Sequence, residues 1–280
     1  MKIQIIGLGL IGGSFCKAIR RSTQHIVLGM DTDLSVQARA LESGAIHAIG
    51  TIETLAQADL ALICLHPEAT LHFLTAHVKD FRKGGLVCDS CGIKVAVTEE
   101  ADRVLIPNGV RFVGCHPMAG REFSGFDYAQ ESLFDGASFI LTPTEKTDHA
   151  AVKELEEFAR SIGFGRTVIA SPAEHDRIIA ATSQLAHVVS NAYIKSPTLR
   201  KQAGFSAGSY LDLTRVAKLH EEMWTSLFLH NREPLLFEID TLIANLKQYR
   251  DAIDAGDADT LRDILREGRE LKEADLKINR

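Results

Sequence analysis

Hydrophobic positions in the N-terminal part of the chain alternate between two periodicities. Short continuous apolar runs, typical of buried parallel strands, are each followed by a segment in which apolar residues recur at three- and four-residue spacings, as in amphipathic helices. The connections are short, and such a repeat is typical of a doubly wound parallel sheet. The expected strands are residues 3–6, 26–30, 58–65 and 86–88, and the expected helices follow residues 7–14 and cover 34–43, 67–78 and a segment from 93.

The pattern changes at about residue 171. Before it, further strands are expected at residues 112–114, 137–141 and 167–169, with a helix over 150–162. After it, strand-like runs disappear and only helical periodicity remains, over residues 174–194, 211–229, 235–255 and 258–277. We therefore expect an α/β fold, with a Rossmann-type doubly wound parallel sheet followed by an all-α C-terminal domain. Gly256 and Asp257 suit the end of one helix and the N-cap of the next.

A glycine-rich loop joins the first strand to the first helix. Its sequence is Gly7-Leu8-Gly9-Leu10-Ile11-Gly12. Gly7 permits a sharp turn out of the strand, Gly9 permits close approach of the backbone to a pyrophosphate, and Gly12 permits the helix to pack against the sheet. The N-terminus of the helix then faces the anion. All six residues are predicted to bind a dinucleotide, so residues 1–170 are predicted to form a dinucleotide-binding domain.

An acidic residue, Asp31, ends the second apolar run, 19 positions after Gly12. This spacing suits a carboxylate that accepts hydrogen bonds from the adenosine ribose. Because a 2′-phosphate would meet a like charge there, the residue favours NAD over NADP. Ligands of such sheets bind beyond the carboxyl ends of the strands, so Leu65 and His66, at the end of the run 58–65, are also assigned to the cofactor site.

Composition limits the range of partners. The 280 residues, which exceed a typical single domain, include 31 Lys plus Arg and 37 Asp plus Glu, a net charge of −6. This balance gives no electrostatic reason to expect nucleic acid or an anionic membrane as a partner. The chain enters a strand at once, without a signal peptide, and no apolar run approaches the ~20 residues that span a bilayer. We expect a cytoplasmic protein.

The five cysteines are expected to be reduced thiols, unless some of them bind a metal ion. Cys88 and Cys91 form a C-x-x-C pair, and Cys115 and His116 could complete four zinc ligands. However, Cys88 and Cys115 end strand-like runs, where cysteine is usually a small buried hydrophobe. A second C-x-x-C is missing, so we expect no metal.

His116 is the leading catalytic candidate. It lies at the end of an expected strand, at the edge of the sheet where the nicotinamide of a dinucleotide should fall. The following Pro117 stiffens the backbone, and a histidine can take up a proton near neutral pH. A histidine before a proline in a loop is also commonly structural.

Seven segments spread over nearly the whole chain carry a more specific signal. They are the glycine loop 7–12, DSCGIK at 89–94, HPMAGRE at 116–122, LF at 133–134, LTP at 141–143, SQLAH at 183–187 and DLTRVA at 212–217. In this order they resemble the motifs of the prephenate/arogenate dehydrogenase family of tyrosine biosynthesis. The resemblance implies an enzyme that decarboxylates a cyclohexadienol oxidatively, with a hydride passed to NAD.

The resemblance also implies roles for individual residues. In the family, the histidine of the HPM motif, here His116, hydrogen-bonds the substrate ring hydroxyl and assists its deprotonation. The arginine of the DLTRVA motif, here Arg215, binds the substrate, for which a planar guanidinium that grips a carboxylate in two places is well suited. His187 matches a second substrate-contacting histidine. The C-terminal residues 171–280 would then bind substrate and, given their surplus apolar stripes, form a homodimer.

The chain departs from the family pattern at three positions. Gly92 stands where the family has a serine that hydrogen-bonds the substrate hydroxyl or the nicotinamide, Gln184 stands where many relatives have His, and Ala186 replaces a Pro. Gly92, Gln184 and the retained Lys94 are nevertheless assigned to the substrate site. The main interpretation is an NAD-dependent prephenate dehydrogenase. The alternatives are an arogenate or amino-prephenate dehydrogenase, and a non-catalytic NAD-binding sensor, which Gly92 makes plausible.

Overall fold

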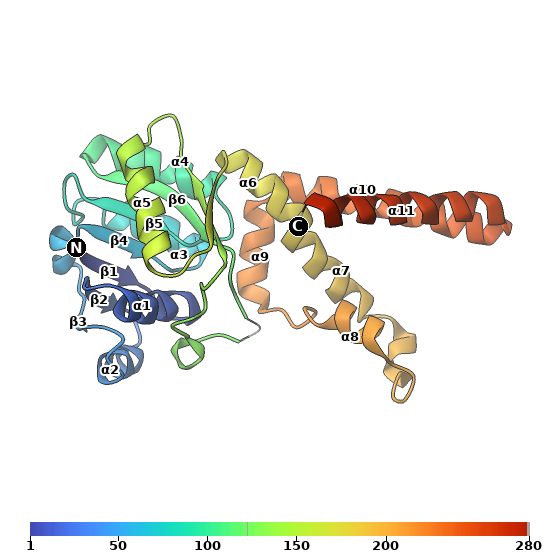
Figure 1. Ribbon diagram of the computed structural model, residues 1–280, viewed down its shortest axis with the longest axis horizontal. Coiled ribbons are helices and arrows are strands. Elements are labelled where there is room, and N and C mark those ends of the chain that lie inside the picture. The colour runs from blue at the N-terminus through green and yellow to red at the C-terminus, as the bar shows by residue number, and fades with distance from the viewer. Residues whose placement is uncertain (122, 279–280) are drawn as a thin grey trace. The chain divides into compact units, whose positions relative to one another are not determined.

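The computed structural model describes residues 1–121 and 123–278, and it contains two compact units, Met1–Asn231 and Arg232–Arg280 (Figure 1). Glu122, the last residue of the HPMAGRE segment, lies outside the described residues. The first unit contains the sheet and a run of helices, and the second contains helices only. These two units do not test the predicted division into domains 1–170 and 171–280, which stays a prediction.

The first unit is built on an eight-stranded sheet in the order β3-β2-β1-β4-β5-β6-β7-β8. Neighbouring strands are parallel except for β6 and β7, where His116 pairs with Ile140 in antiparallel register. The doubly wound parallel sheet expected from the sequence is therefore confirmed, except that β7 runs antiparallel to β6 and that β3 is an additional short edge strand. The strands are β1 Lys2–Ile6, β2 Ile26–Met30, β3 Ala48–Ile49, β4 Leu60–Ile63, β5 Leu86–Asp89, β6 Arg111–Pro117, β7 Ser138–Thr142 and β8 Arg166–Ile169.

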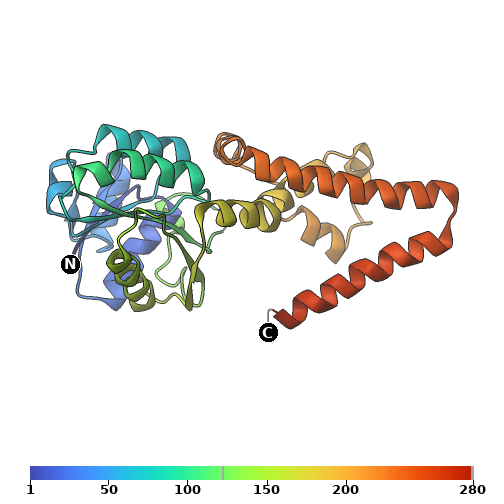
Figure 2. The same cartoon turned by 90° about the horizontal axis from the view of Figure 1, so that it is seen from above.

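Helices cover both faces of this sheet (Figure 2). One face packs against α1 Leu10–Ser22, α2 Leu34–Glu42 and α5 His149–Ser161, and the other against α3 Pro67–Ala76 and α4 Val95–Val104. Alternate residues of one strand supply the two cores, because successive side chains point to opposite faces: Ile5 belongs to the first core and Ile6 to the second. Short helical turns occur at η1 Glu53–Gln57, η2 Ile106–Asn108 and η3 Phe126–Tyr128.

The rest of the first unit is helical, as expected, but its helices are more broken than predicted. The elements are α6 Pro172–Ile179, a π-helical turn η4 Ala180–Gln184, α7 Leu185–Tyr193, η5 Pro197–Lys201, α8 Gly208–Thr214 and α9 Glu221–His230. The prediction of one helix over 211–229 was wrong. The helix stops after α8 because two α7 side chains bind the carbonyl groups of the residues that follow it. His187 Nδ1 lies 3.2 Å from Val216 O, and Asn191 Nδ2 donates to Ala217 O at 3.0 Å.

The second unit consists of α10 Arg232–Ala255 and α11 Ala258–Ile278. Gly256 adopts a φ of +66°, a conformation that favours glycine, and the Asp257 carboxylate accepts the Thr260 N–H at 3.0 Å. The predicted stop and N-cap are therefore confirmed. Among the described residues, no helix combines the length and apolar character that crossing a membrane requires.

Candidate functional site

The glycine loop after β1 has the shape that a phosphate cradle needs. Gly7 has a φ of +89°, and a Cβ atom on it would lie 2.5 Å from Cys64 O. A Cβ atom on Gly12 would lie 1.8 Å from Gly7 O, whereas one on Gly9 would meet no atom within 4 Å. Gly9 is also the N-cap of α1 and offers no capping side chain. The loop is therefore closed to side chains where it packs on the sheet and open where an anion would approach the helix N-terminus.

The Asp31 carboxylate lies directly beside this loop. Its Oδ2 accepts the Leu8 N–H at 2.7 Å, and its Oδ1 accepts the Asp33 N–H at 2.9 Å. Each oxygen keeps a further lone pair for a ligand hydroxyl. The residues of the loop and Asp31 thus fit a dinucleotide, although their roles as cofactor ligands stay predictions.

Leu65 and His66 lie beyond the carboxyl end of β4. Leu65 Cδ2 lies 2.8 Å from the position of a Cβ atom on Gly7, so this side chain borders the glycine loop. His66 is the N-cap of α3 and is exposed. Desolvation and the neighbouring His220 lower the pKa of His66, which favours the neutral ring. Leu65 therefore borders the loop, and the assignment of both residues to the cofactor site stays a prediction.

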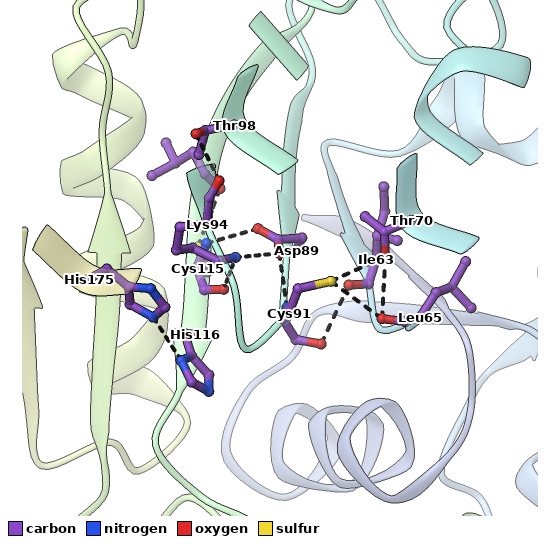
Figure 3. Close-up of polar contacts among 12 residues, drawn as sticks. Ile63, Leu65, Thr70, Asp89, Cys91, Lys94, Thr98, Cys115, His116 and His175 are labelled. Carbon is purple, nitrogen blue, oxygen red and sulfur yellow. Dashed lines mark hydrogen bonds and ion pairs between the residues drawn. The ribbon is translucent and has the colours of Figure 1, made fainter. Parts of the chain in front are cut away.

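His116 lies near the carboxyl end of β6 with its two ring nitrogens in different surroundings (Figure 3). Its Nδ1 lies 2.9 Å from Nε2 of His175 on α6, and His175 Nδ1 lies 2.7 Å from Asp176 Oδ1. Burial, the neighbouring His175 and the Lys94 ammonium lower the pKa of His116 well below the usual range. The imidazole is therefore neutral near pH 7 and able to accept a proton.

A buried ion pair anchors the turn beside His116. The Lys94 ammonium binds the Asp89 carboxylate and donates to Cys115 O at 2.6 Å, and both side chains are fully buried. Asp89 also accepts the N–H groups of Cys91 at 2.9 Å and Cys115 at 3.0 Å (Figure 3). These contacts tie the end of β5 to β6. The buried position of Lys94 supports a structural role, and its assignment as a substrate ligand stays a prediction.

Gly92 faces the imidazole across this turn. A Cβ atom on Gly92 would lie 3.8 Å from both Cε1 and Nε2 of His116 and 3.6 Å from Leu227 Cδ2, which are ordinary contact distances. A Cβ atom at this position would therefore fit without a steric clash. Gly92 is brought next to His116 as expected for neighbours in one site.

The remaining predicted residues lie in the helical part of the first unit. Gln184, in the π-helical turn, is 1 % exposed; its amide donates to Leu227 O at 3.3 Å and accepts from Asn231 Nδ2 at 2.7 Å. The His187 ring lies 4.0 Å from the Trp224 ring, and its pKa is lowered by desolvation and by Arg215. The exposed Arg215 is thus close enough to His187 to act on its charge.

Two residues of this environment, His175 and Asp176, were missed by sequence reasoning. His175 and Asp176 are 2 % exposed and contact His116 and the start of α4, and Asn231 donates to Asp176 O at 2.8 Å. The only signal in the sequence was an adjacent His-Asp pair in a helix that begins with Pro172. Nothing in one sequence indicates which strand such a pair will face.

The cysteines considered as zinc ligands are all free thiols. Burial raises the pKa of the Cys91 thiol to about 12, and its sulfur lies 3.3 Å from Thr70 Oγ1 and 3.4 Å from Leu65 O. Across residues 1–121 and 123–278, no group of three His, Cys, Asp or Glu side chains is arranged to hold a metal ion.

Comparison with known proteins shows which protein family the chain resembles. Residues 15–168 match the family model described as prephenate dehydrogenase, nucleotide-binding domain, and residues 171–267 match the one described as prephenate dehydrogenase, dimerization domain. The chain is 33 % identical to a prephenate dehydrogenase of Bacillus subtilis over 92 % of this chain and 72 % of that protein.

Two solved structures resemble the fold over almost the full length of both chains. A Synechocystis arogenate dehydrogenase has a TM-score of 0.84 at 27 % identity, with 98 % of this chain and 99 % of that chain covered. An Aquifex aeolicus prephenate dehydrogenase in complex with hydroxyphenyl propionate and NAD+ has a TM-score of 0.85 at 26 % identity, with 99 % and 98 % covered.

Proposed function

The chain belongs to the prephenate dehydrogenase family, and we propose that it catalyses the oxidative decarboxylation of prephenate to 4-hydroxyphenylpyruvate with NAD as the hydride acceptor. One observation carries the proposal: His116 stands at the carboxyl end of a sheet strand with Nδ1 held by His175 and Nε2 facing Gly92. Ligands of doubly wound sheets bind beyond that edge. An imidazole placed there can accept the proton of a ring hydroxyl.

The proposed chemistry needs little covalent help from the protein. When bound, NAD supplies a two-electron acceptor for the hydrogen on the carbinol carbon. His116 Nε2 accepts the hydroxyl proton, which makes the carbinol C–H a better hydride donor. The ring carboxylate leaves as CO2, its bonding electrons enter the ring, and the proton on His116 returns to the oxygen of the aromatic product. Aromatisation drives the reaction, so the chain mainly has to orient its substrate.

Orientation falls to the remaining predicted residues. Arg215 and His187 are proposed to bind the carboxylates, because a guanidinium pairs with a carboxylate at two points and the Trp224 ring holds the His187 ring in place. Gln184, Gly92 and Lys94 are proposed to line the substrate site. The residues Gly7, Leu8, Gly9, Leu10, Ile11 and Gly12, with Asp31, Leu65 and His66, are proposed to hold NAD.

A homodimer is the proposed assembly. Within α10 and α11, large apolar side chains such as Ile243, Ile253 and Leu271 are 57 %, 64 % and 65 % exposed, and residues 171–267 match a dimerization domain. Burying such a surface stabilises association. The cytoplasmic location expected from the sequence stays a prediction.

Arogenate is the second candidate substrate, since the Synechocystis relative is described as an arogenate dehydrogenase. The proposal is tested by following absorbance at 340 nm with prephenate and arogenate, each with NAD and NADP, for the wild type and His116→Asn. We expect NADH from prephenate and NAD, and a loss of about 10²- to 10⁴-fold in His116→Asn. His149→Asn, at the exposed start of α5, serves as the control and should keep full activity.

Two results would contradict the proposal. Faster turnover of arogenate than of prephenate would make the chain an arogenate dehydrogenase. Tight NAD binding without turnover of either substrate would instead make it a sensor.

A further inference from the structure

Three side chains form a linear chain of contacts that ends at the proposed base. Asp176 Oδ1 lies 2.7 Å from His175 Nδ1. His175 Nε2 in turn lies 2.9 Å from His116 Nδ1, as Figure 3 shows. The two rings are inclined by 64° with centroids 5.1 Å apart, so the contact between them is an edge-on hydrogen bond. The reaction steps proposed above give no role to Asp176, and none to His175 beyond its contact with His116.

The Asp176 carboxylate, at one end of this series of contacts, determines the position of every proton along it. A carboxylate only accepts, so His175 Nδ1 must carry a hydrogen and donate it to Asp176. In neutral His175 the other nitrogen, Nε2, is then the acceptor, and His116 Nδ1 must be the donor. This leaves His116 Nε2 without a hydrogen, with its lone pair on the side of Gly92. That tautomer is the one that can accept a proton from a substrate hydroxyl.

Resting on the function proposed above, we propose that His175 and Asp176 are a positioning pair that fixes His116 in its Nδ1–H tautomer and holds its ring in place. Once Nε2 has taken the substrate proton, the imidazolium keeps its Nδ1–H bond to His175. The Asp176 charge then stabilises the cation through the intervening ring. No proton has to pass along the chain, and none is lost when His116 returns its proton to the product.

Asp176 is held rigidly enough for this role. Its carboxylate also accepts the backbone N–H groups of Lys94 at 2.7 Å and Val95 at 2.9 Å, which begin α4. These two hydrogen bonds fix the orientation of the carboxylate at the start of α4. The side chain of Asn231, at the C-terminal end of α9, donates to the backbone carbonyl of Asp176. The pair is thus anchored to the same turn, 89–94, that places Gly92 beside His116.

The charged groups that face the two rings are few among the described residues. His116 is faced by His175 and Lys94, and His175 by Asp176, Lys94 and Asp89. Desolvation is the largest cause of the lowered pKa of both rings, so both are neutral near pH 7. Neutral rings are the condition under which tautomer positions are set by hydrogen bonds.

The test uses His175→Phe, which keeps a planar ring and removes the acceptor, and His175→Gln, whose amide oxygen can replace Nε2. We expect His175→Phe to lower kcat on the order of 10- to 100-fold with KM changed less than about 3-fold, because only the base is mispositioned. His175→Gln should recover most of the loss. His149→Phe, on the exposed start of α5, is the matched control and should match the wild type.

A second readout does not need turnover. Nitrogen-15 NMR of the ligand-free wild type near pH 7.5 should show His116, identified by the signal missing in His116→Asn, as the Nδ1–H tautomer; His175→Phe should shift it toward Nε2–H. An Nε2–H tautomer in the wild type overturns the proposal even if His175→Phe fails to fold. Wild-type kcat in a folded His175→Phe also overturns it. Absence of turnover in the wild type would instead count against the proposed function and leave the NMR test decisive for the pair.

Discussion

Gly92 lies beside the imidazole of His116, and a Cβ atom added to Gly92 would be 3.8 Å from its Nε2. The neighbouring Leu227 side chain would be 3.6 Å away, so the space accepts a small side chain without displacement. The backbone of Gly92 is also outside the left-handed region that only glycine adopts readily. The absence of a side chain here is therefore not imposed by the fold.

Gly92→Ser should restore a hydroxyl next to the base. We expect an unchanged thermal midpoint, within about 2 °C, and a kcat/KM for prephenate raised by roughly 2- to 10-fold, the equivalent of one net hydrogen bond. Gly92→Ala fills the same space without a hydroxyl and is the control. Equal kinetics for the two variants would show that the hydroxyl finds no partner in the complex.

Asp31→Asn tests the choice of cofactor. The substitution removes the charge that would repel a 2′-phosphate, while the amide oxygen can still accept the Leu8 N–H. We expect the ratio of kcat/KM with NAD to that with NADP to fall by on the order of 10-fold, about 1.4 kcal/mol. Asp33→Asn is the control, because Asp33 caps α2 through Ser35 N and Asn caps equally well. If both variants keep the wild-type ratio, Asp31 does not contact the ribose.

The fold was predictable because its signals are local. Periodicity identified the strands and helices of the sheet, and the N-cap Asp257 marked a helix start that the structure confirms. The break after α8 was not predictable. It depends on side chains of His187 and Asn191 that bind carbonyls 29 and 26 residues away, and no local pattern encodes such contacts.

The candidate site divides in the same way. The glycine loop and His116 follow from their positions at strand ends, which a sequence reveals. His175 and Asp176 lie at least 59 residues after His116 in the sequence. Their residue types do not distinguish them from other polar residues of a helix. The role proposed for the pair depends on its burial against β6 and α4, which only the folded chain defines.

Lys94→Met tests whether the buried ion pair is structural. Removing the ammonium leaves the Asp89 carboxylate fully buried with only backbone N–H partners. We expect a loss of about 3 kcal/mol in the free energy of unfolding, measured by urea denaturation with circular dichroism, because an uncompensated buried charge is costly. Lys153→Met, on the exposed side of α5, should change stability by less than about 0.5 kcal/mol. A similar small effect of Lys94→Met would contradict a structural role and favour substrate contact.

The pH dependence of activity follows from the lowered pKa of His116, caused mainly by burial and then by His175 and Lys94. A protonated imidazole cannot accept the substrate proton, so kcat/KM should stay level from pH 8 to about 6.5 and fall only at lower pH. A profile that already falls above pH 6.5 would contradict this assignment of the base.

Stability should fall in the same direction. The folded pKa values of His116 and His175 lie below the unfolded value of about 6.5, so below that pH the unfolded chain binds more protons than the folded one. The free energy of unfolding should therefore decrease as the pH drops from 7 to 5.5, by at most about 1.4 kcal/mol per pH unit for each ring. In His116→Gln one of the two rings no longer titrates, so the slope measured by urea denaturation should become shallower. An unchanged slope in His116→Gln would mean that the ring is protonated in the folded chain, and the neutral base on which the mechanism depends would be lost.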